Sequence, residues 1–315
     1  GITAAGSLLS ATGTIVDNDA RPRIWINDAT IQRPASGTAT MKFVVNLFDS
    51  ATGKIATPSG LATTFSWATV AGSAVPDSDY LAASGTGTIA AGRTTDTIRV
   101  QIVGDARYHA PLSFSVTLSS LVNVATSVSR ATGVGTILSS VGRPVLVASS
   151  ASITEGDAGK KPFGIVVALR DSATGNPVVS RIDLPFTWTS NSGTALVGTD
   201  FVAVGGSGKV SAGSSQATVV TDSVIGNLVH QSDRSFGISV AASGADLRPG
   251  TSTVTGTILD DDPLPLVRIE DASIRRDTLA GSKIPLWFRV RLTDPRSGLA
   301  TTSGLPVVVS WRTID

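Results

Sequence analysis

The chain has 315 residues and is almost neutral, with 25 basic and 24 acidic side chains and a net charge of +1. This balance argues against a nucleic-acid-binding surface, and no apolar run reaches the length of about 18 residues that a membrane helix needs. The absence of cysteine excludes disulfides, thiolate metal ligands and cysteine nucleophiles. The only two histidines, His109 and His230, are both expected at the surface, which leaves few enzyme mechanisms that need an imidazole.

Three short motifs recur along the chain at a nearly constant interval of about 121 to 123 residues. They are Gly-Thr-Ile at 13–15, 135–137 and 256–258, a motif ending in tryptophan at 65–67, 186–188 and 309–311, and Asp-Ser-Ala-Thr-Gly at 49–53 and 171–175. A fixed period of this length indicates a tandem array of similar domains.

The motifs divide the chain into two complete and two partial repeats. We expect residues 1–20 to supply the closing strand of a preceding repeat, and residues 21–141 and 142–263 to form complete repeats. Residues 264–315 are expected to form the opening half of a further repeat. We therefore interpret the chain as a piece of a longer protein.

Within each repeat, apolar residues alternate with polar ones, which is the period of half-buried antiparallel strands. In chain order, the clearest alternating segments are 43–47, 114–118, 165–169, 236–240 and 288–292. Turn-forming residues separate these segments, and no stretch has a helical period. About seven short strands in each repeat predict an all-β fold of immunoglobulin-like antiparallel sandwiches. We expect the large indole rings to anchor the cores, at Trp67, Trp188 and Trp311.

The joints between repeats are short and contain proline, at Pro22, Pro144, Pro263 and Pro265. Proline fixes its own φ and restricts the residue before it, so such joints limit swivelling. We therefore expect consecutive sandwiches to form an extended rod.

An ordered set of motifs carries a family resemblance over essentially the whole chain. In the second repeat these motifs are Ser152-Ile153-Thr154-Glu155-Gly156-Asp157, Gly193-Thr194-Ala195, Gly198-Thr199-Asp200-Phe201, Ala212-Gly213, Val224-Ile225-Gly226-Asn227 and Gly256-Thr257-Ile258-Leu259-Asp260-Asp261-Asp262. The set resembles the Calx-beta repeat, which occurs in sodium–calcium exchangers, in integrin beta-4 and in large bacterial surface proteins. The resemblance implies a tandem array of Calx-beta sandwiches.

The resemblance also implies a calcium site, because in calcium-binding members carboxylates from loops at one end of the sandwich collect the ion. Carried over to the second repeat, the expected metal ligands are Glu155, Asp200, Asn227, Asp260, Asp261 and Asp262. Calcium takes about six to eight oxygen ligands, so this set suits it. The loop at 226–234 is less acidic than is usual in the family, which predicts one ion and not a cluster of ions. The alternative, that these acids are ordinary solvated loop residues, stays open at this point.

The other repeats depart from the calcium pattern. In the first repeat Arg33 aligns with Glu155, and Ser139, Ser140 and Val141 replace the closing acidic triplet. The remaining acids, Asp79 and Asp105, are too few to hold an ion, and we expect the arginine to form a salt bridge in its place. The third repeat has Arg276 at the same position. Ca²⁺ is therefore expected at the second repeat only.

The sequence gives little support for a phosphate-binding or a catalytic site. The glycine-rich stretches at 85–87 and 205–209 lack both the spacing and the following helix of a phosphate-binding loop. Apart from Ca²⁺ at the second repeat, no cofactor is expected. The acidic clusters coincide with the repeat junctions and not with a catalytic pair, so we expect no enzyme activity.

We interpret the chain as a non-enzymatic structural segment of a large extracellular or cell-surface protein of bacterial type, such as a fibre, a stalk or an adhesin shaft. Its expected partners are neighbouring repeats of the same chain, copies of itself in a fibre and other cell-surface components, but not nucleic acid. Two alternatives remain: a calcium-responsive regulatory module, and a carbohydrate- or protein-binding surface domain.

Overall fold

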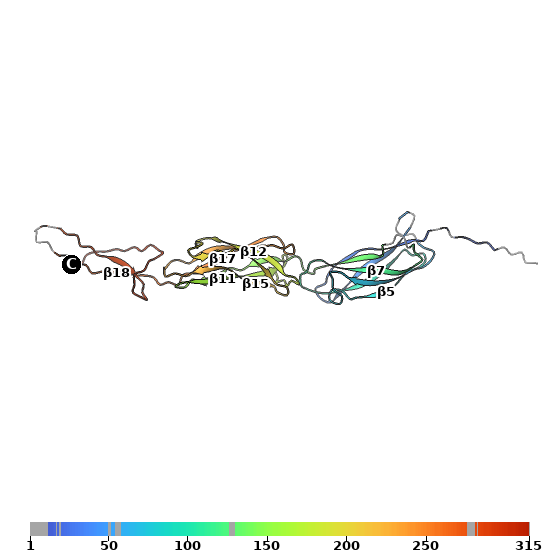
Figure 1. Ribbon diagram of the computed structural model, residues 1–315, viewed down its shortest axis with the longest axis horizontal. Coiled ribbons are helices and arrows are strands. Elements are labelled where there is room, and N and C mark those ends of the chain that lie inside the picture. The colour runs from blue at the N-terminus through green and yellow to red at the C-terminus, as the bar shows by residue number, and fades with distance from the viewer. Residues whose placement is uncertain are drawn as a thin grey trace, which may run out of the picture. The chain divides into compact units, whose positions relative to one another are not determined.

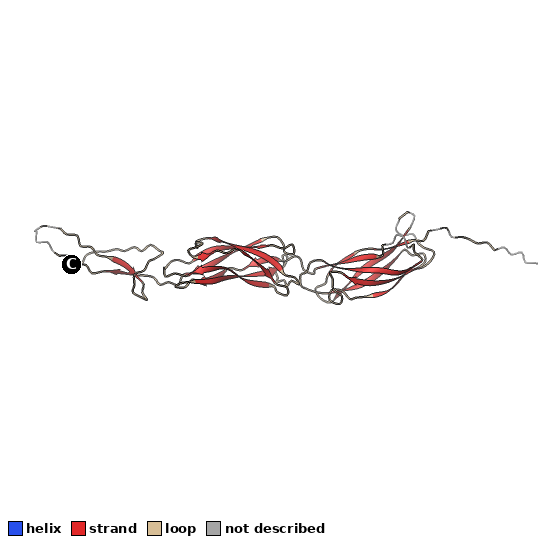
Figure 2. Ribbon diagram, in the orientation of Figure 1, coloured by secondary structure: helices blue, strands red, loops and turns tan. Residues whose placement is uncertain are grey.

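The computed structural model describes residues 12–16, 18, 20–49, 52–53, 58–125, 130–275, 281 and 283–314. The chain divides into two compact units, one formed by Gly1–Ala106 with Ala110–Ser140 and the other by Arg107–His109 with Val141–Asp315. Within the described ranges the regular structure consists of strands alone (Figure 2), which confirms the all-β prediction. No helix long and apolar enough to span a membrane is found in these ranges.

The first unit is a two-sheet sandwich (Figure 1). Its smaller sheet has the order β1-β3-β6, formed by β1 (Arg23–Ile26), β3 (Thr38–Phe48) and β6 (Thr95–Val103). Its larger sheet has the order β2-β8-β7-β4-β5, formed by β2 (Ala29–Gln32), β8 (Thr132–Leu138), β7 (Leu112–Val122), β4 (Thr63–Ala71) and β5 (Ser84–Ile89). The opening strand is divided between the sheets, since β1 pairs antiparallel with β3 and β2 pairs parallel with β8.

The second unit contains a sandwich of the same plan. One sheet has the order β13-β15-β11-β9, formed by β13 (Phe201–Val202), β15 (Gln216–Ile225), β11 (Lys160–Arg170) and β9 (Val145–Ala148). The other has the order β10-β17-β16-β12-β14, formed by β10 (Ala151–Thr154), β17 (Thr251–Leu259), β16 (Arg234–Ala242), β12 (Leu184–Ser192) and β14 (Gly206–Val210). Two further strands, β18 (Leu266–Ile269) and β19 (Val290–Thr293), pair with each other.

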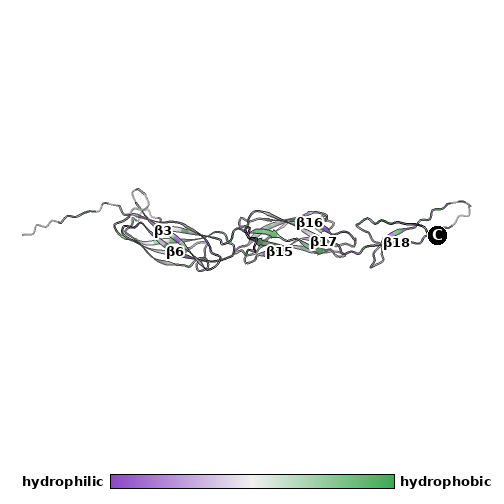
Figure 3. Cartoon of the chain, turned by 180° about the vertical axis from the view of Figure 1, so that it is seen from behind, coloured by the Kyte–Doolittle hydropathy of each residue, from purple (hydrophilic) through white to green (hydrophobic). Residues whose placement is uncertain are grey.

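Each sandwich has its own core, formed by side chains that the alternation expected from the sequence places inward. Figure 3 colours the chain by hydropathy, with hydrophobic and hydrophilic residues along the strands. In the first core Phe43 and Phe114 are at most 1% exposed, and Phe114 stacks on Tyr80 with ring centroids 4.2 Å apart. The second core repeats this pair as Phe236 and Phe201, with centroids 4.3 Å apart. The two sequence repeats therefore have equivalent aromatic contacts in their cores.

The tryptophans only partly follow the core prediction. Trp67 and Trp188 are half-buried and pack against the two cores. Trp311 is 84% exposed, so the core expectation is wrong for it. Among the described residues of 264–315 the only sheet is the pair β18-β19, which leaves no second layer to cover an indole.

The glycine-rich stretches form edge strands and not phosphate loops. Gly206 and Gly208 lie in β14, paired with β12. A Cβ atom at Gly208 would come within 2.9 Å of the Phe186 ring, and one at Gly206 within 2.7 Å of the Trp188 ring. These glycines therefore let the aromatic side chains of β12 lie directly on the neighbouring strand.

The segment Arg107–His109 contributes to the core of the second unit. Tyr108 is 4% exposed, and its hydroxyl donates a hydrogen bond of 3.0 Å to the carboxylate of Asp246. His109 is 3% exposed, so the expected surface position is wrong for it. The sequence could not reveal this, because the residues that bury the segment come from much later in the chain.

Candidate metal centre

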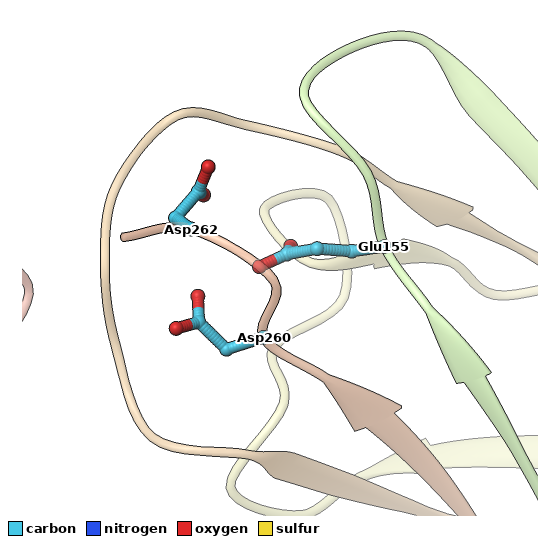
Figure 4. Close-up of side chains that lie close together, drawn as sticks. All are labelled: Glu155, Asp260 and Asp262. Atoms are coloured by element: carbon cyan, nitrogen blue, oxygen red, sulfur yellow. The ribbon is translucent and has the colours of Figure 1, made fainter. Parts of the chain in front are cut away.

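Three carboxylates meet at one end of the second sandwich. Glu155 follows β10, whereas Asp260 and Asp262 follow β17. Strands β10 and β17 are parallel neighbours, with Thr154 opposite Leu259, so both strands end at the same edge of the sheet. One carboxylate oxygen from each acid lies within 4.8 Å of the other two (Figure 4). Strand pairing thus places residues over 100 positions apart within the reach of a single ion.

The carboxylates of this cluster are largely buried, and two of them are incompletely hydrogen-bonded. Glu155 is 0% and Asp262 6% exposed. Both oxygens of Asp262 and Oδ1 of Asp260 are buried without a hydrogen-bond donor among the described residues. Burial raises the pKa of Glu155, and burial together with the charges of Asp260, Asp261 and Asp157 raises the pKa of Asp262. A buried carboxylate without donors costs free energy, and a cation would relieve that cost.

The amides of the neighbouring loop orient Glu155. Asn227 Nδ2 donates to Glu155 Oε2 at 2.7 Å, and Gln231 Nε2 donates to Oε1 at 3.0 Å. The amide oxygen of Asn227 accepts the backbone N–H of Val229 at 2.7 Å. The neutral loop therefore supplies donors to a carboxylate, which an acidic loop would not do.

Arg234, at the start of β16, joins two of the expected ligands. Its Nη2 donates to Glu155 Oε2 at 3.0 Å, and its Nη1 forms an ion pair with Asp200 Oδ1. The other oxygen of Asp200 accepts the backbone N–H of Leu196 at 2.7 Å. Asp200 is thus engaged by an arginine and by its own loop.

Of the six expected ligands, the structure brings Glu155, Asp260 and Asp262 together. Asp200 and Asn227 contact the same network through Arg234 and Glu155 respectively. Asp261 is exposed, and its Oδ1 accepts the backbone N–H of Gly156 at 3.0 Å.

Two charged or polar residues beside the cluster were not expected from the sequence. His230 is half-buried, with Nδ1 2.9 Å from Asp260 Oδ2 and 2.9 Å from the carbonyl oxygen of Asp262. The surface position expected for His230 is therefore wrong. Arg296, from the segment after the sandwich, pairs with Asp157 at 3.3 Å and donates to the carbonyl oxygen of Asp261 at 3.1 Å. No sequence motif marked either residue, because both reach the cluster from loops.

The first repeat has an arginine at the equivalent end. Arg33 stands where the second repeat has Glu155, and its side chain is 0% exposed. Its Nη2 donates to Asp79 Oδ1 at 2.6 Å, its Nε donates to the carbonyl oxygen of Val103 at 2.8 Å, and its Nη1 lies 3.9 Å from Asp105. The expected salt bridge is present, and it is buried. Arg276, its counterpart in the third repeat, lies outside the described residues.

The residues of the second repeat fit a hard divalent cation. Three carboxylates, two of which have unbonded oxygens, supply oxygen ligands and a negative charge, which is the donor chemistry of Ca²⁺. Backbone carbonyls and water would complete a shell of about six to eight oxygens. The first repeat offers a buried guanidinium at this position and does not fit a metal ion.

Comparisons with solved structures find similar chains at low sequence identity. The crystal structure of CBD12 from CALX1.2 is 15% identical, covering 70% of this chain and 79% of that chain with a TM-score of 0.32. The crystal structure of the calcium binding domain CBD12 of CALX1.1 is also 15% identical, covering 69% and 79% with a TM-score of 0.31. A protein of unknown function from Porphyromonas gingivalis W83 is 9% identical, covering 75% and 96% with a TM-score of 0.22.

A search of the curated proteins finds no match. The family model of the Calx-beta domain matches residues 18–138 and residues 165–262. Glu155 precedes the second matched segment, whereas the closing acids 260–262 lie within it. The two matched segments together make up more than half of the chain, and the protein therefore belongs to the Calx-beta domain family.

Proposed function

We propose that this chain is a non-catalytic tandem-repeat segment whose second sandwich is stabilised by one Ca²⁺, held by Glu155, Asp260 and Asp262. The observation that carries the proposal is the burial of Asp262, both of whose carboxylate oxygens lack a donor among the described residues. Calx-beta domains are binding domains known from calcium-binding regulatory proteins. The unbonded oxygens of Asp260 and Asp262 would coordinate a calcium ion, whose positive charge would compensate the buried negative charge.

The ion would act mainly on the fold and on the segment that follows it. The backbone N–H of Gly304 in that segment donates to the carbonyl oxygen of His230 at 2.9 Å, and the ring of His230 contacts Asp260. Asp260 and Asp262, which begin that segment, are held by the same ion in this proposal. Ligand binding to the folded state alone stabilises that state, so calcium would strengthen this junction.

The role that we propose for such an array is structural, as the shaft of a large extracellular or cell-surface protein of bacterial type. Supporting features are the two sandwiches of one plan, the short proline-containing joints and the low charge of the sequence. Its partners would be adjacent repeats and copies of itself or other surface components.

The alternative is a calcium-responsive regulatory module, in which the ion changes conformation and not only stability. The buried pair of Arg33 with Asp79 disfavours this in the first repeat, because that repeat carries its own fixed cation. A calcium-induced change in small-angle scattering of the chain would favour regulation.

Scanning calorimetry of the whole chain, with Ca²⁺ and with a chelator, tests the proposal. We expect Ca²⁺ to raise the melting temperature of the second unit and to leave that of the first unchanged. Phe114→Ala and Phe236→Ala, which damage one core each, assign the two transitions. Equal shifts of both transitions, or of neither, would contradict the proposed site.

A further inference from the structure

Two loops of the chain make the same main-chain contact with the repeat that follows them. They connect β6 to β7 and β15 to β16, and we call them the joint loops, 104–111 and 226–233. Tyr108 in the first loop forms a parallel bridge with Ser180, and His230 in the second forms one with Ser303. The second bridge lies one repeat length after the first, and both lie inside the second unit.

Hydrogen bonds between main-chain atoms define each bridge. The N–H of Tyr108 donates to the carbonyl oxygen of Val179, and the N–H of Arg181 donates to the carbonyl oxygen of Tyr108, both at 2.8 Å. At the later bridge the N–H of Gly304 donates to the carbonyl oxygen of His230 at 2.9 Å. Arg181 and Gly304 occupy equivalent positions, so the pairing has the same register in both repeats.

The segment that receives each loop is fixed by its own repeat. The backbone N–H groups of Val178 and Thr301 donate to the strand that precedes them, both at 3.1 Å. A serine turn follows, in which the serine Oγ accepts the backbone N–H two residues later at 3.1 Å, and in the three repeats the serines are Ser59, Ser180 and Ser303. The receiving segments are called the serine-turn segments, 178–182 and 301–305. The same turn in all three repeats indicates that the receiving surface belongs to the repeat and not to one joint.

The side chains at the two bridges differ, although the main-chain contact is the same. Tyr108 is 4% exposed within the second core, and its hydroxyl donates to Asp246 at 3.0 Å. His230 is half-buried, and its ring contacts Asp260. Main-chain pairing supplies attraction that does not depend on sequence, whereas pockets for side chains supply specificity. The bridge can therefore recur between repeats whose sequences differ, with a strength that depends on the residue at this position.

Both ends of a joint loop are held by strands of its own repeat. The loop 104–111 follows the last residue of β6, Val103, and precedes the first residue of β7, Leu112. A loop restrained at both ends loses less conformational entropy when it pairs than a free peptide would. The restraint therefore favours pairing of Tyr108 with the following repeat.

We propose that the joint loop of each repeat docks on the serine-turn segment of the next, so that main-chain pairing joins consecutive repeats in addition to the proline-containing linker. The partner of this surface is a neighbouring repeat of the same kind. This inference rests on the tandem-array role in the proposed function and does not involve calcium. Tyr108 is the anchor of the earlier joint, because it is buried in the core of the repeat that follows its own.

Scanning calorimetry of the whole chain in chelator tests the inference separately from calcium binding. Tyr108→Ala removes a buried ring, and we expect it to lower the melting temperature of the second unit by about 6–20 °C and to leave that of the first unchanged. Phe114→Ala and Phe236→Ala assign the two transitions. The matched control is Ala106→Ser, at an exposed position of the same loop, which should change neither transition.

Amide hydrogen exchange of the same proteins measures the main-chain pairing itself. In Tyr108→Ala we expect the N–H of Arg181 to exchange at least about tenfold faster than in the wild type, because the loop that accepts it is released. The N–H of Gly304 should exchange at an unchanged rate, since its partner loop is unaltered. If Tyr108→Ala does not fold, Tyr108→Phe takes its place. That variant loses only the hydrogen bond to Asp246, and it should lower the second transition by about 2–4 °C.

A fall in the first transition alone, or no change in either, would overturn the inference, because Tyr108 would then not anchor the following repeat. An unchanged exchange rate at Arg181 would overturn it as well, since that N–H would not depend on the docked loop. Failure of Ca²⁺ to shift the second transition would instead contradict the proposed calcium site and leave this inference intact.

Discussion

Arg33 donates a hydrogen bond of 2.6 Å to Asp79, and neither side chain is more than 1% exposed. A buried ion pair becomes strongly destabilising when one partner is removed, because the other charge is left without compensation. Asp79→Asn is therefore expected to lower the stability of the first unit by about 3–5 kcal/mol. Denaturant unfolding, monitored with and without Ca²⁺, measures this loss, which should be the same in both. A loss below about 1 kcal/mol would mean that the pair behaves as an exposed one.

The stacked aromatic pairs predict equal costs in the two cores. Phe114→Ala and Phe236→Ala each remove a ring that is 1% exposed and stacked on a second ring. Truncation of a buried phenylalanine costs about 3–5 kcal/mol. Each variant should lower one of the two thermal transitions, while the exposed Thr253→Ala serves as the control. Loss of both transitions from either variant would show that the units do not unfold independently.

The core could be predicted from the sequence because period-two alternation depends only on the pleat of a strand. It correctly placed Phe43, Ile165 and Phe236 inside. It failed at Trp311, whose burial requires a second sheet that the described residues after 264 do not form. Alternation tells which face a residue occupies but not whether that face is covered.

Only a part of the candidate metal centre could be predicted from the sequence. The resemblance identified Glu155, Asp260 and Asp262, which the parallel pairing of β10 with β17 brings together. It did not assign a role to Arg234, because that role depends on two contacts with residues far away in the chain. His230 was missed for the same reason. Long-range contacts of loop side chains are set by packing, which no local pattern encodes.

Arg296 is expected to weaken calcium binding slightly. Its guanidinium lies 3.3 Å from Asp157, with both side chains more than half exposed. Burial and the neighbouring acids raise the pKa of Asp262, and the charge of Arg296 offsets a part of that rise. A positive charge there competes with a cation. Arg296→Gln should raise the calcium affinity by up to about fivefold at low salt, the range of an exposed pair, and by less at high salt. Lower affinity in the variant would mean that Arg296 supports the site through its contact with the Asp261 carbonyl.

The raised pKa of Asp262 predicts a pH-dependent stability in chelator. Its ordinary pKa is about 3.9, and burial raises it in the folded state. The folded state therefore holds this proton more tightly than the unfolded state, so the contribution of Asp262 favours folding at low pH and turns unfavourable as the pH rises through the raised pKa. Asp262→Asn should thus be more stable than the wild type at pH 7, with the difference shrinking as the pH falls towards 4. A difference that grows on acidification would contradict the assigned direction.

The central claim is that the buried carboxylates of the second repeat form a binding site for a cation. The most direct measurement is the unfolding free energy of the wild type and of Asp262→Asn at pH 7, each in Ca²⁺ and in chelator. We predict a reversal of sign, with Asp262→Asn the more stable protein in chelator and the wild type the more stable in Ca²⁺. If the same protein were the more stable one in both Ca²⁺ and chelator, the claim would be contradicted, because Ca²⁺ would then not reverse the effect of the Asp262 carboxylate on stability.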